Sequence, residues 1–552
     1  MKLTENNLYS IRNSYIVVKK IENRLEAINI RGWKGEMTVF SVPCDEAEIS
    51  PDFGKLTYVT DGKQHELALY GKFGVILRGE SNISVKYHKL SECRNVANGY
   101  EALCCMKRGN AWFLNDYKNE SYLWVYPMQG EAELQAERNG TCSGFESIRY
   151  DLKAGKTGYE TKFFTSYDMG TLTYTDDGVT FAEAEHATKT DFAKWIEKYP
   201  KIPEEWVYTI WVNFVGQHGI LPTDSQVSGK MGMRALWSWD NLFSAMALAG
   251  KFDQKAYDLF MMPYRFLKDN GYMFDSITDD KINYSYTKPP VHGLVYAELM
   301  KKSSFFTDEE RLKEVVALMR KNTEYWLYHR AEEPFYIHGN DSTCDDATCF
   351  TATTYAVTPD MYALLSVQCE TISDIYTRLG EVQESKNFSK LSKELAKKVE
   401  LFVLEDGMSL KSMETGEYIR GESLLLYRAF IVCDKLSEKS KALFIKNIKN
   451  FETRYGFASE PPTSKDYNGS GYWKGAVWAP DQYLINYALR KAGENEYADE
   501  MAKRYVEGIL KAGCYENIDG QKGIGNNCSV FSWTAATAIL LSIDNENRLL
   551  RR

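Results

Sequence analysis

The hydrophobic periodicity of the chain changes at about residue 203. From there to the C-terminus, apolar residues recur every three or four positions, as Phe388, Leu391, Leu395 and Val399 do along a Lys- and Glu-rich segment. This spacing places apolar side chains on one face of an amphipathic helix. About twelve such segments follow one another, near residues 203–216, 238–250, 253–268, 290–302, 308–328, 358–379, 382–403, 419–433, 437–451, 478–492, 495–512 and 531–543.

Twelve consecutive helices restrict the folds that this part of the chain can adopt. A strict repeat of roughly 30–45 residues, which would indicate an open solenoid, is not visible. Six helical hairpins arranged in a ring need twelve helices. We therefore predict an all-α (α/α)6 barrel, or toroid, over residues 205–552.

Residues 1–185 have a different pattern, with short runs of Val, Ile, Tyr, Phe and Thr between Gly, Asp and Asn turns. Two hairpins are predicted, one turning at Asp61-Gly62 between 56–60 and 66–70, the other turning near Asp177-Gly178 within 171–181. Asp-Gly supplies the positive φ of tight hairpin turns. Many short strands at a spacing of roughly 8–12 residues predict an all-β sandwich domain.

The two patterns meet in an amphipathic segment, Asp191–Tyr199, which Pro200 and Pro203 end. A chain of 552 residues is too long for one ordinary core. The predicted organisation is a β-sandwich at 1–185, a linker helix at 186–204 and the barrel, which carries the candidate catalytic residues, at 205–552.

Charge and cysteine usage exclude several classes of partner. The formal net charge is −9 and no Lys/Arg-rich block is present, which disfavours nucleic acid and anionic membranes. The sequence contains no apolar run long enough to span a bilayer, and its first residues lack a signal-peptide core. Eleven irregularly spaced Cys indicate reduced thiols. These features predict a cytoplasmic protein, and they leave its oligomeric state open.

The loops of the helical part carry clusters of polar and aromatic residues. The segment 340–348 contains Asp341, Asp345 and Asp346 among small and hydroxylated residues. Such a cluster suits acid chemistry on a polar ligand such as a sugar, although a helix cap with a solvated acidic turn would use the same residue types. Aromatic residues make up 14% of the chain and can stack on sugar rings, although a large aromatic core explains most of them.

Two further clusters precede predicted helices. Trp239-Asp240 offers a ring face and a hydroxyl acceptor to a sugar, while the alternative role for Asp240 is that of a helix N-cap. Lys288-Pro289-Pro290 has the composition of a stiff helix entrance. His292 follows it, either as a buried, hydrogen-bonded histidine or as a ligand contact.

The last two clusters lie near the C-terminus. The segment 471–480, with Tyr472, Trp473, Lys474 and Trp478, forms either an aromatic wall with one cation or an anchor for its loop. Glu516 is expected just beyond a helix C-terminus, where the helix dipole disfavours a carboxylate, so its presence indicates a role other than stability. Two carboxyl groups on separate loops suit inverting glycoside hydrolysis, in which they stand roughly 6.5–9.5 Å apart.

Taken in order over about 230–540, these motifs resemble glycoside hydrolase family 63 and, more distantly, the trehalases of family 37. The resemblance implies that Asp345 is the general acid and Glu516, in Tyr-Glu-Asn, the general base. It further implies that the Trp-Asp pair and the Tyr-Trp motif line the sugar subsite. The full set of predicted substrate-binding residues is Trp239, Asp240, His292, Asp341, Tyr472, Trp473, Lys474, Trp478, Asn517 and Trp533.

Some residues depart from the family pattern. Cys344 stands where Trp is usual and Thr343 where Gly is usual, while Lys474 replaces Arg and Ala476 replaces Pro. Lys474 lacks the planar, bidentate contact of an Arg. The two carboxyl positions are retained, so the departures concern the identity of the substrate.

We therefore predict an inverting exo-glycosidase that hydrolyses an α-linked glucoside or a related α-disaccharide or oligosaccharide. No organic cofactor and no metal ligand are implied; a structural calcium ion is compatible with the sequence, although no diagnostic loop is visible. An inverting disaccharide phosphorylase is one alternative, but it uses phosphate in place of the base. A sugar epimerase would need catalytic histidines, and a non-catalytic glycan-binding protein would keep the aromatic residues without needing both carboxyl groups.

Overall fold

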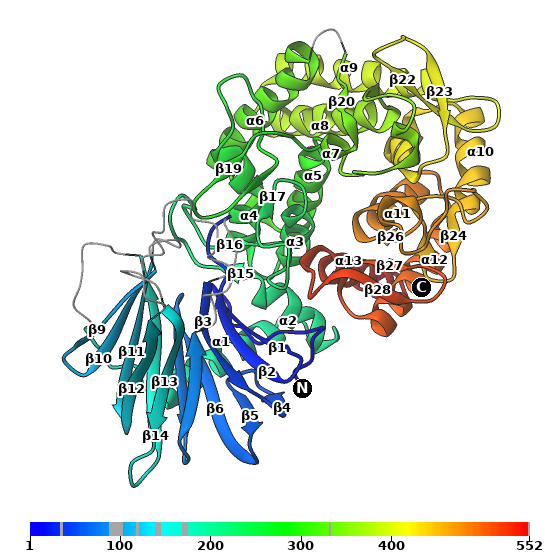
Figure 1. Ribbon diagram of the computed structural model, residues 1–552. Coiled ribbons are helices and arrows are strands. Elements are labelled where there is room, and N and C mark those ends of the chain that lie inside the picture. The colour runs from blue at the N-terminus through cyan, green and yellow to red at the C-terminus, as the bar shows by residue number, and fades with distance from the viewer. Residues whose placement is uncertain are drawn as a thin grey trace. The chain divides into compact units, whose positions relative to one another are not determined.

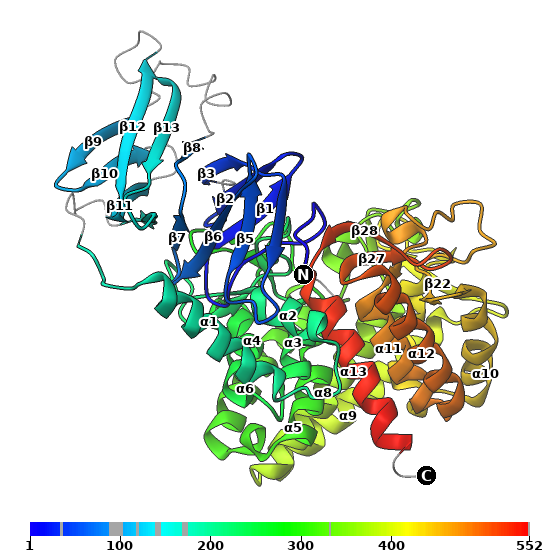
Figure 2. The ribbon, with the colours of Figure 1, turned by 90° about the horizontal axis from the view of Figure 1, so that it is seen from below.

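The computed structural model describes residues 1–33, 37–87, 103–116, 121–138, 145–167, 175–330 and 333–549. The chain forms two compact units (Figure 1, Figure 2). Unit 1 consists of Met1–Asp224 and Thr278–Lys281, and unit 2 consists of Ser225–Ile277 and Ile282–Arg552.

Unit 1 contains two antiparallel sheets that pack face to face, which confirms the predicted β-sandwich. One sheet has the order β1 (Ile16–Ile21), β2 (Arg24–Asn29), β3 (Met37–Pro43), β8 (Ile83–Tyr87), β13 (Phe145–Lys153), β12 (Glu131–Arg138). The other has the order β4 (Glu46–Ile49), β5 (Leu56–Thr60), β6 (Lys63–Tyr70), β7 (Gly74–Gly79), β14 (Tyr159–Ser166), β11 (Ser121–Gln129), β10 (Ala111–Asp116), β9 (Leu103–Arg108). Phe40 of one sheet and Phe163 of the other have ring centroids 4.9 Å apart.

The first predicted hairpin is present, and the second is not seen in the part of 171–181 that the structure describes. Thr60 of β5 pairs with Lys63 of β6. Between them, Asp61 and Gly62 have φ angles of 50° and 70°, as a two-residue hairpin turn requires. For the second hairpin, residues 171–174 lie outside the described residues, and residues 179–180 have no regular structure.

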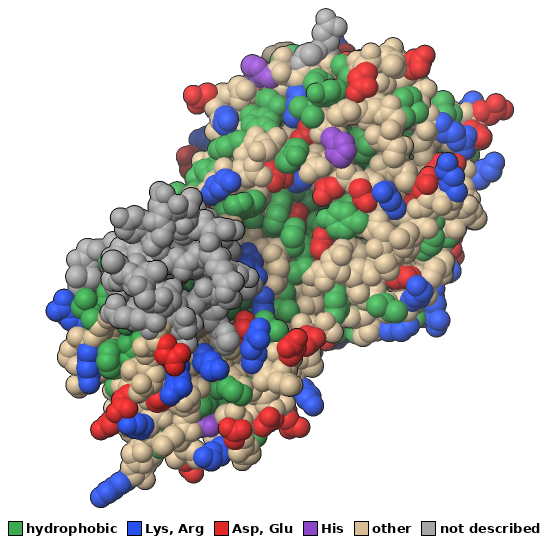
Figure 3. Space-filling model, in the orientation of Figure 1, with side chains coloured by type: hydrophobic (Ala, Val, Ile, Leu, Met, Phe, Trp, Pro, Cys, Tyr) green, Lys and Arg blue, Asp and Glu red, His purple; other side chains and the backbone are tan. Residues whose placement is uncertain are grey.

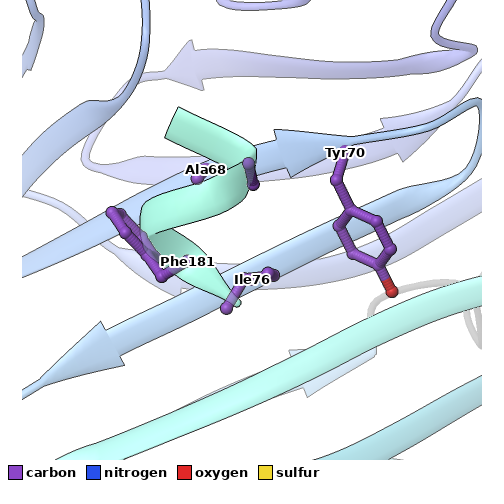
Figure 4. Close-up of a cluster of buried hydrophobic side chains, with 5 residues drawn as sticks. Ala68, Tyr70, Ile76 and Phe181 are labelled. Atoms are coloured by element: carbon purple, nitrogen blue, oxygen red, sulfur yellow. The ribbon is translucent and has the colours of Figure 1, made fainter. Parts of the chain in front are cut away.

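Helix α1 (Phe181–Ile196) begins where the second hairpin was expected to continue. Thr180 and Glu183 form a capping box, in which each side chain accepts a hydrogen bond from the other residue's backbone N–H. The apolar face of α1 packs on β6 and β7, where Phe181 and Ala184 join Ala68, Tyr70 and Ile76 (Figure 4). Half of the segment expected as a linker is therefore part of α1, and unit 1 continues through α2 (Glu204–Val212) to Asp224.

Unit 2 is helical. Its principal helices are α3 (Asn241–Leu248), α4 (Asp253–Arg265), α5 (His292–Lys302), α6 (Glu309–Glu324), α8 (Pro359–Arg378), α9 (Val382–Val399), the 3-10 segment η6 (Leu424–Lys435), α10 (Glu438–Asn447), α11 (Ala479–Lys491), α12 (Asn495–Ala512) and α13 (Ser532–Leu549). Each corresponds to one of the predicted helical segments; the first predicted segment corresponds to α2, which falls in unit 1.

Six of these elements contact one another in a closed series, α3–α5–α8–η6–α11–α13–α3. A second set packs against members of this ring: α4 on α3, α6 and α9 on α8, α10 on η6, and α12 on α11. The closed series is the inner ring of the predicted (α/α)6 barrel.

Short antiparallel sheets tie the helix connections of unit 2 together. They are β17 (Leu236–Trp237), β18 (Ser276–Ile277) and β19 (Ile282–Asn283); β20 (Tyr336–Ile337), β21 (Tyr355–Val357), β22 (Met408–Ser412) and β23 (Tyr418–Gly421); and β26 (Val477–Trp478), β27 (Tyr515–Asp519) and β28 (Ile524–Ser529). Trp478 pairs with Asn517 across β26 and β27, which joins two of the motif segments.

On the face shown in Figure 3, acidic and basic side chains are interspersed over the described residues. None of the helices searched among the described residues is long and apolar enough to cross a membrane.

We expect Phe181→Ala to lower the free energy of unfolding of the protein by about 3 kcal/mol, because it leaves a cavity between α1 and the sheet. Chemical denaturation followed by circular dichroism measures the change. His186→Ala, on the exposed face of the same helix, serves as the control and should change the free energy by less than about 0.5 kcal/mol. A loss below about 1 kcal/mol for Phe181→Ala would contradict the packing described here.

Candidate active site

Asp345 lies on an irregular loop that follows the short helix α7 (His338–Ser342). The backbone turns sharply at Thr343, which has a φ of 72°, and Asp345 follows two residues later in a half-buried position. Burial is the largest cause that raises the pKa of Asp345, and the charges of Asp275 and Asp346 raise it further. Lys288 opposes this rise.

Glu516 lies on strand β27, not directly beyond a helix end as the sequence predicted, and is 5% exposed. The Tyr472 hydroxyl donates a hydrogen bond to Glu516 Oε1 over 3.1 Å. The Trp533 indole N–H donates to the Glu516 carbonyl over 2.9 Å and holds the strand in place. Burial raises the pKa of Glu516, hydrogen bonds from Tyr472 and the Cys528 backbone lower it, and the charge of Asp345 raises it.

A third carboxyl group, that of Asp240, belongs to the same environment. It stands at the N-terminus of α3, but its side chain makes no capping hydrogen bond. Instead it accepts a hydrogen bond from Ser228 Oγ over 2.7 Å and is 7% exposed. Burial raises the pKa of Asp240 to about 7; Ser228 and Lys288 oppose the rise, and Glu516 adds to it.

Lys288 provides the positive charge among these carboxyl groups. Its Nζ lies 3.0 Å from Asp275 Oδ1 and donates to the Asn340 carbonyl over 2.7 Å, at the start of the loop that carries Asp345. Burial lowers the pKa of Lys288, but the charges of Asp275, Asp345 and Asp240 outweigh it, and the net shift is upward. Asp240, Asp275, Asp345 and Glu516 therefore form one electrostatic cluster with Lys288.

The segment predicted as either an aromatic wall or a loop anchor lies beside Glu516; its Trp473 and Trp478 side chains are 2% and 1% exposed, which fits the loop anchor. Trp473 stacks on Trp478 with ring centroids 3.8 Å apart and an interplanar angle of 3°. The ring of Tyr472 meets Trp478 edge-on at 4.7 Å. The Trp473 backbone N–H donates to Asp346 Oδ1 over 2.9 Å, and Lys474 Nζ lies 3.6 Å from Asp346 Oδ2. The segment with Tyr472 and Trp473 is thus tied both to the loop with Asp345 and to the strand with Glu516.

Two more predicted residues have buried N–H groups. Asn517 Oδ1 accepts from Asn526, while its Nδ2 has no hydrogen-bond partner among the described residues. Trp239 is fully buried, and its indole N–H likewise lacks a partner among the described residues. Its ring therefore contributes to the floor behind the site and presents no open face for stacking.

His292 does not join the carboxyl cluster. It is 0% exposed and lies edge-on to Tyr264 and Phe260, with ring centroids 5.0 and 6.1 Å away. Burial lowers its pKa to about 3. The structure thus buries His292 in an aromatic core at the start of α5, but neither ring nitrogen has a hydrogen-bond partner among the described residues, so the hydrogen bond of that alternative is not present.

Asp341 was expected to bind substrate, but both of its oxygens are used within the protein. Oδ1 accepts from the Thr287 backbone N–H over 3.1 Å, and Oδ2 accepts from the Ile337 backbone N–H over 2.8 Å. Arg330 Nη1 also donates to Oδ2 over 3.0 Å, in a pair whose side chains are almost fully buried. Asp341 therefore fixes the start of the loop.

Sequence reasoning missed Lys288, Asp275 and Ser228. Lys288 was visible in the Lys-Pro-Pro motif, whose composition was assigned to a helix entrance. Asp275 and Ser228 had no local signal, because only the fold brings them beside Asp240 and Lys288. Among the described residues, no group of three or more His, Cys, Asp or Glu side chains is placed to hold a metal ion.

Residues 233–534, more than half of the chain, match the family described as the mannosylglycerate hydrolase MGH1-like glycoside hydrolase domain. The chain belongs to this family. The MGH1-like match contains every predicted site residue, from Trp239 to Trp533. It also confirms the family-level resemblance to the glycoside hydrolases of family 63.

Two curated relatives match short segments of the chain. A mannosylglycerate hydrolase from Rubrobacter radiotolerans is 36% identical over 81 residues, which is 14% of this chain and 18% of the relative. Mannosylglycerate hydrolase MGH1 from Selaginella moellendorffii is 27% identical over 88 residues, which is 16% of this chain and 18% of the relative. The matched segments thus span less than a fifth of the length of these relatives.

Solved structures share the fold of this MGH1-like protein. A family 63 mannosylglycerate hydrolase from Thermus thermophilus, in complex with glucose, matches with a TM-score of 0.55 and 15% identity, over 61% of this chain and 99% of that chain. A bacterial glucoamylase complexed with acarbose matches with a TM-score of 0.66 and 10% identity, over 99% of this chain and 95% of that chain. The second match covers both the β-sandwich and the barrel.

Asp341→Asn should lower the free energy of unfolding by about 3–5 kcal/mol, because it leaves the buried Arg330 guanidinium without its counter-charge. Urea denaturation measures the loss. Glu333→Gln removes a carboxylate from a partly exposed pair with Lys411 and, as the control, should cost no more than about 1 kcal/mol. Equal costs for the two variants would contradict a structural role for the Asp341–Arg330 pair.

Proposed function

We propose that this protein hydrolyses a short α-linked glycoside with inversion at the anomeric carbon, using Asp345 as general acid and Glu516 as general base. The observation that carries the proposal is the electrostatic cluster itself. A half-buried carboxyl group on a loop and a buried one on a strand, far apart in the sequence, share one environment that raises the pKa of both. Carboxyl groups with perturbed pKa values cluster at functional sites.

Asp345 suits the role of the acid. It is half-buried, so its proton can reach a glycosidic oxygen, and burial together with Asp275 and Asp346 favours its protonated form. After the proton has passed to the leaving oxygen, the resulting carboxylate is stabilised by the charge of Lys288.

Glu516 suits the role of the base. Hydrogen bonds from the Tyr472 hydroxyl and the Cys528 backbone stabilise its ionised form, although burial opposes ionisation. The bond from Tyr472 also orients the carboxylate, so that its other oxygen can hold the attacking water. Inversion follows when this water attacks the anomeric carbon from the face opposite the departing oxygen.

Sugar recognition is assigned to Asp240, Asn517 and the half-buried Tyr472. Asp240 can accept hydrogen bonds from sugar hydroxyls when ionised, and the Asn517 Nδ2 donor lacks a protein partner among the described residues. The curated relatives are mannosylglycerate hydrolases, so mannosylglycerate is a substrate to test beside the α-glucosides.

The product anomer tests the reaction directly. Proton NMR of the protein with mannosylglycerate, glucosylglycerate, trehalose and simple α-glucosides, α-mannosides and α-galactosides should show the β-anomer of one sugar appearing first. An α-anomer would contradict inversion. A sugar phosphate formed only with added phosphate would indicate a phosphorylase, and binding without turnover a glycan-binding protein.

On the substrate found in this way, Asp345→Asn and Glu516→Gln should each lower kcat by about 10²–10⁴-fold, since each removes a proton-transfer group. Asp374→Asn is the control, because Asp374 on α8 also has a pKa raised by burial but interacts with Glu370 and Arg378. It should leave kcat unchanged. Retention of kcat in either of the first two variants would reassign the acid or the base.

Tyr472→Phe should shift the acidic limb of the kcat/KM profile to higher pH. Tyr472 lowers the pKa of Glu516, so its loss raises that pKa, and the base then ionises only at higher pH. The alkaline limb, set by deprotonation of Asp345, should stay in place. Tyr467→Phe is the control, because the Tyr467 hydroxyl has no hydrogen-bond partner among the described residues. An unmoved acidic limb would remove Glu516 as the base.

A further inference from the structure

Arg428 is a fully buried cation of unit 2 that contacts the loop carrying Asp345. It lies on η6 and is 0% exposed. Its Nε donates to Asp481 Oδ1 on α11. Its Nη1 donates to the Ser342 carbonyl over 3.3 Å and to Thr343 Oγ1 over 3.1 Å. One guanidinium therefore joins two inner-ring elements to the loop that carries Asp345.

The contact with Thr343 falls at the sharpest point of that loop. Thr343 has a φ of 72°, a conformation that a β-branched residue rarely adopts. Such a residue persists only where its surroundings hold it. Arg428 binds both the hydroxyl of Thr343 and the carbonyl of the preceding residue, so it holds the strained turn from the core side.

Arg428 also contacts the two tryptophan motifs. Its Cζ lies 5.7 Å from the ring centroid of Trp239 and 5.6 Å from that of Trp473. Both distances lie within the range of a cation–π interaction. The backbone N–H of Trp473 donates to Asp346, the residue next to Asp345. The same guanidinium thus lies against Trp239, Trp473 and the loop that carries Asp345.

We propose that Arg428 is a positioning residue, which sets the place of Asp345 by fixing Thr343 and Trp473 against Asp481. A lysine would not replace it, because one ammonium group cannot reach Asp481, Ser342 and Thr343 together in the plane of a guanidinium. The effect of Arg428 on the position of the loop does not depend on which reaction the protein catalyses, whereas its effect on turnover rests on the proposed function.

Hydrogen exchange tests the position of the loop without a substrate. Arg428→Lys and Thr343→Val, which removes the hydroxyl but keeps the size of the side chain, should each speed exchange in 338–347 by about tenfold or more. Exchange in α9 should not change. Arg490→Lys is the matched control, because Arg490 pairs with Asp499 between α11 and α12; it should leave 338–347 as protected as in the wild type.

Kinetics on a substrate of the wild-type protein provide the second readout. Both variants should lower kcat by about 10–100-fold with KM nearly unchanged, as expected for a displaced catalytic group. Unaltered exchange in 338–347 overturns the proposal. So does faster exchange spread equally over 338–347 and α9, because that pattern indicates general destabilisation. Faster exchange confined to the loop, in a protein that turns over no glycoside, would uphold the positioning role and count against the proposed function alone.

Discussion

Among the described residues, the electrostatic cluster of unit 2 holds more carboxyl groups than cations. Lys288 faces Asp240, Asp275 and Asp345, and Asp345 in turn interacts with Glu516. Ionised carboxylates are costly in a dry interior, so burial favours protonation wherever a partner is missing. Asp275 is held by Lys288 at 3.0 Å, while burial raises the pKa of Asp240, Asp345 and Glu516. Because these carboxyl groups outnumber the cations beside them, their protonated forms are favoured. General acid catalysis requires a proton donor of this kind.

Two other buried cations are fully matched and have a different effect. Arg330 pairs with Asp341, and Arg428 pairs with Asp481. Asp341 bonds to the Ile337 backbone N–H at the start of the short helix α7, and Arg428 bonds to Ser342 and Thr343 at its end. Two aspartates four residues apart thus differ in purpose: Asp341 fixes the backbone, and Asp345 is the proposed acid.

The fold class could be predicted from the sequence because the spacing of apolar residues along the chain reflects local structure and requires no knowledge of tertiary contacts. The helical spacing from about residue 203 and the Asp61-Gly62 turn both depend on local chemistry. Trp473, Tyr472 and Glu516 were found because their motifs are unusual in composition. Asp341 was predicted to bind substrate because the sequence alone does not distinguish a structural aspartate from a reactive one. The ion pair with Arg330 forms only in the folded chain. Lys288 and Asp275 were missed because each reaches the cluster from a separate segment. Arg428 was missed because it reaches the loop that carries Asp345 from η6, through a contact that only the folded chain creates.

The two proposed catalytic carboxyl groups differ in how firmly they are held. Glu516 lies on a strand paired on both sides, with Trp533 bonded to its carbonyl and Tyr472 to its carboxylate. Asp345 lies on an irregular loop. Its neighbours are held in place: Lys288 bonds to Asn340, Arg428 to Thr343, and the Trp473 backbone to Asp346. A general base must hold one water in line with the anomeric carbon. A rigid strand favours this, because a small misplacement of the water slows the attack. An acid on a loop depends instead on the contacts that hold the loop, such as those of Arg428 with Ser342 and Thr343. The departures from the family pattern at Thr343 and Cys344 fall on that loop, where both side chains are buried, so a change there acts on the placement of the acid and leaves the base undisturbed.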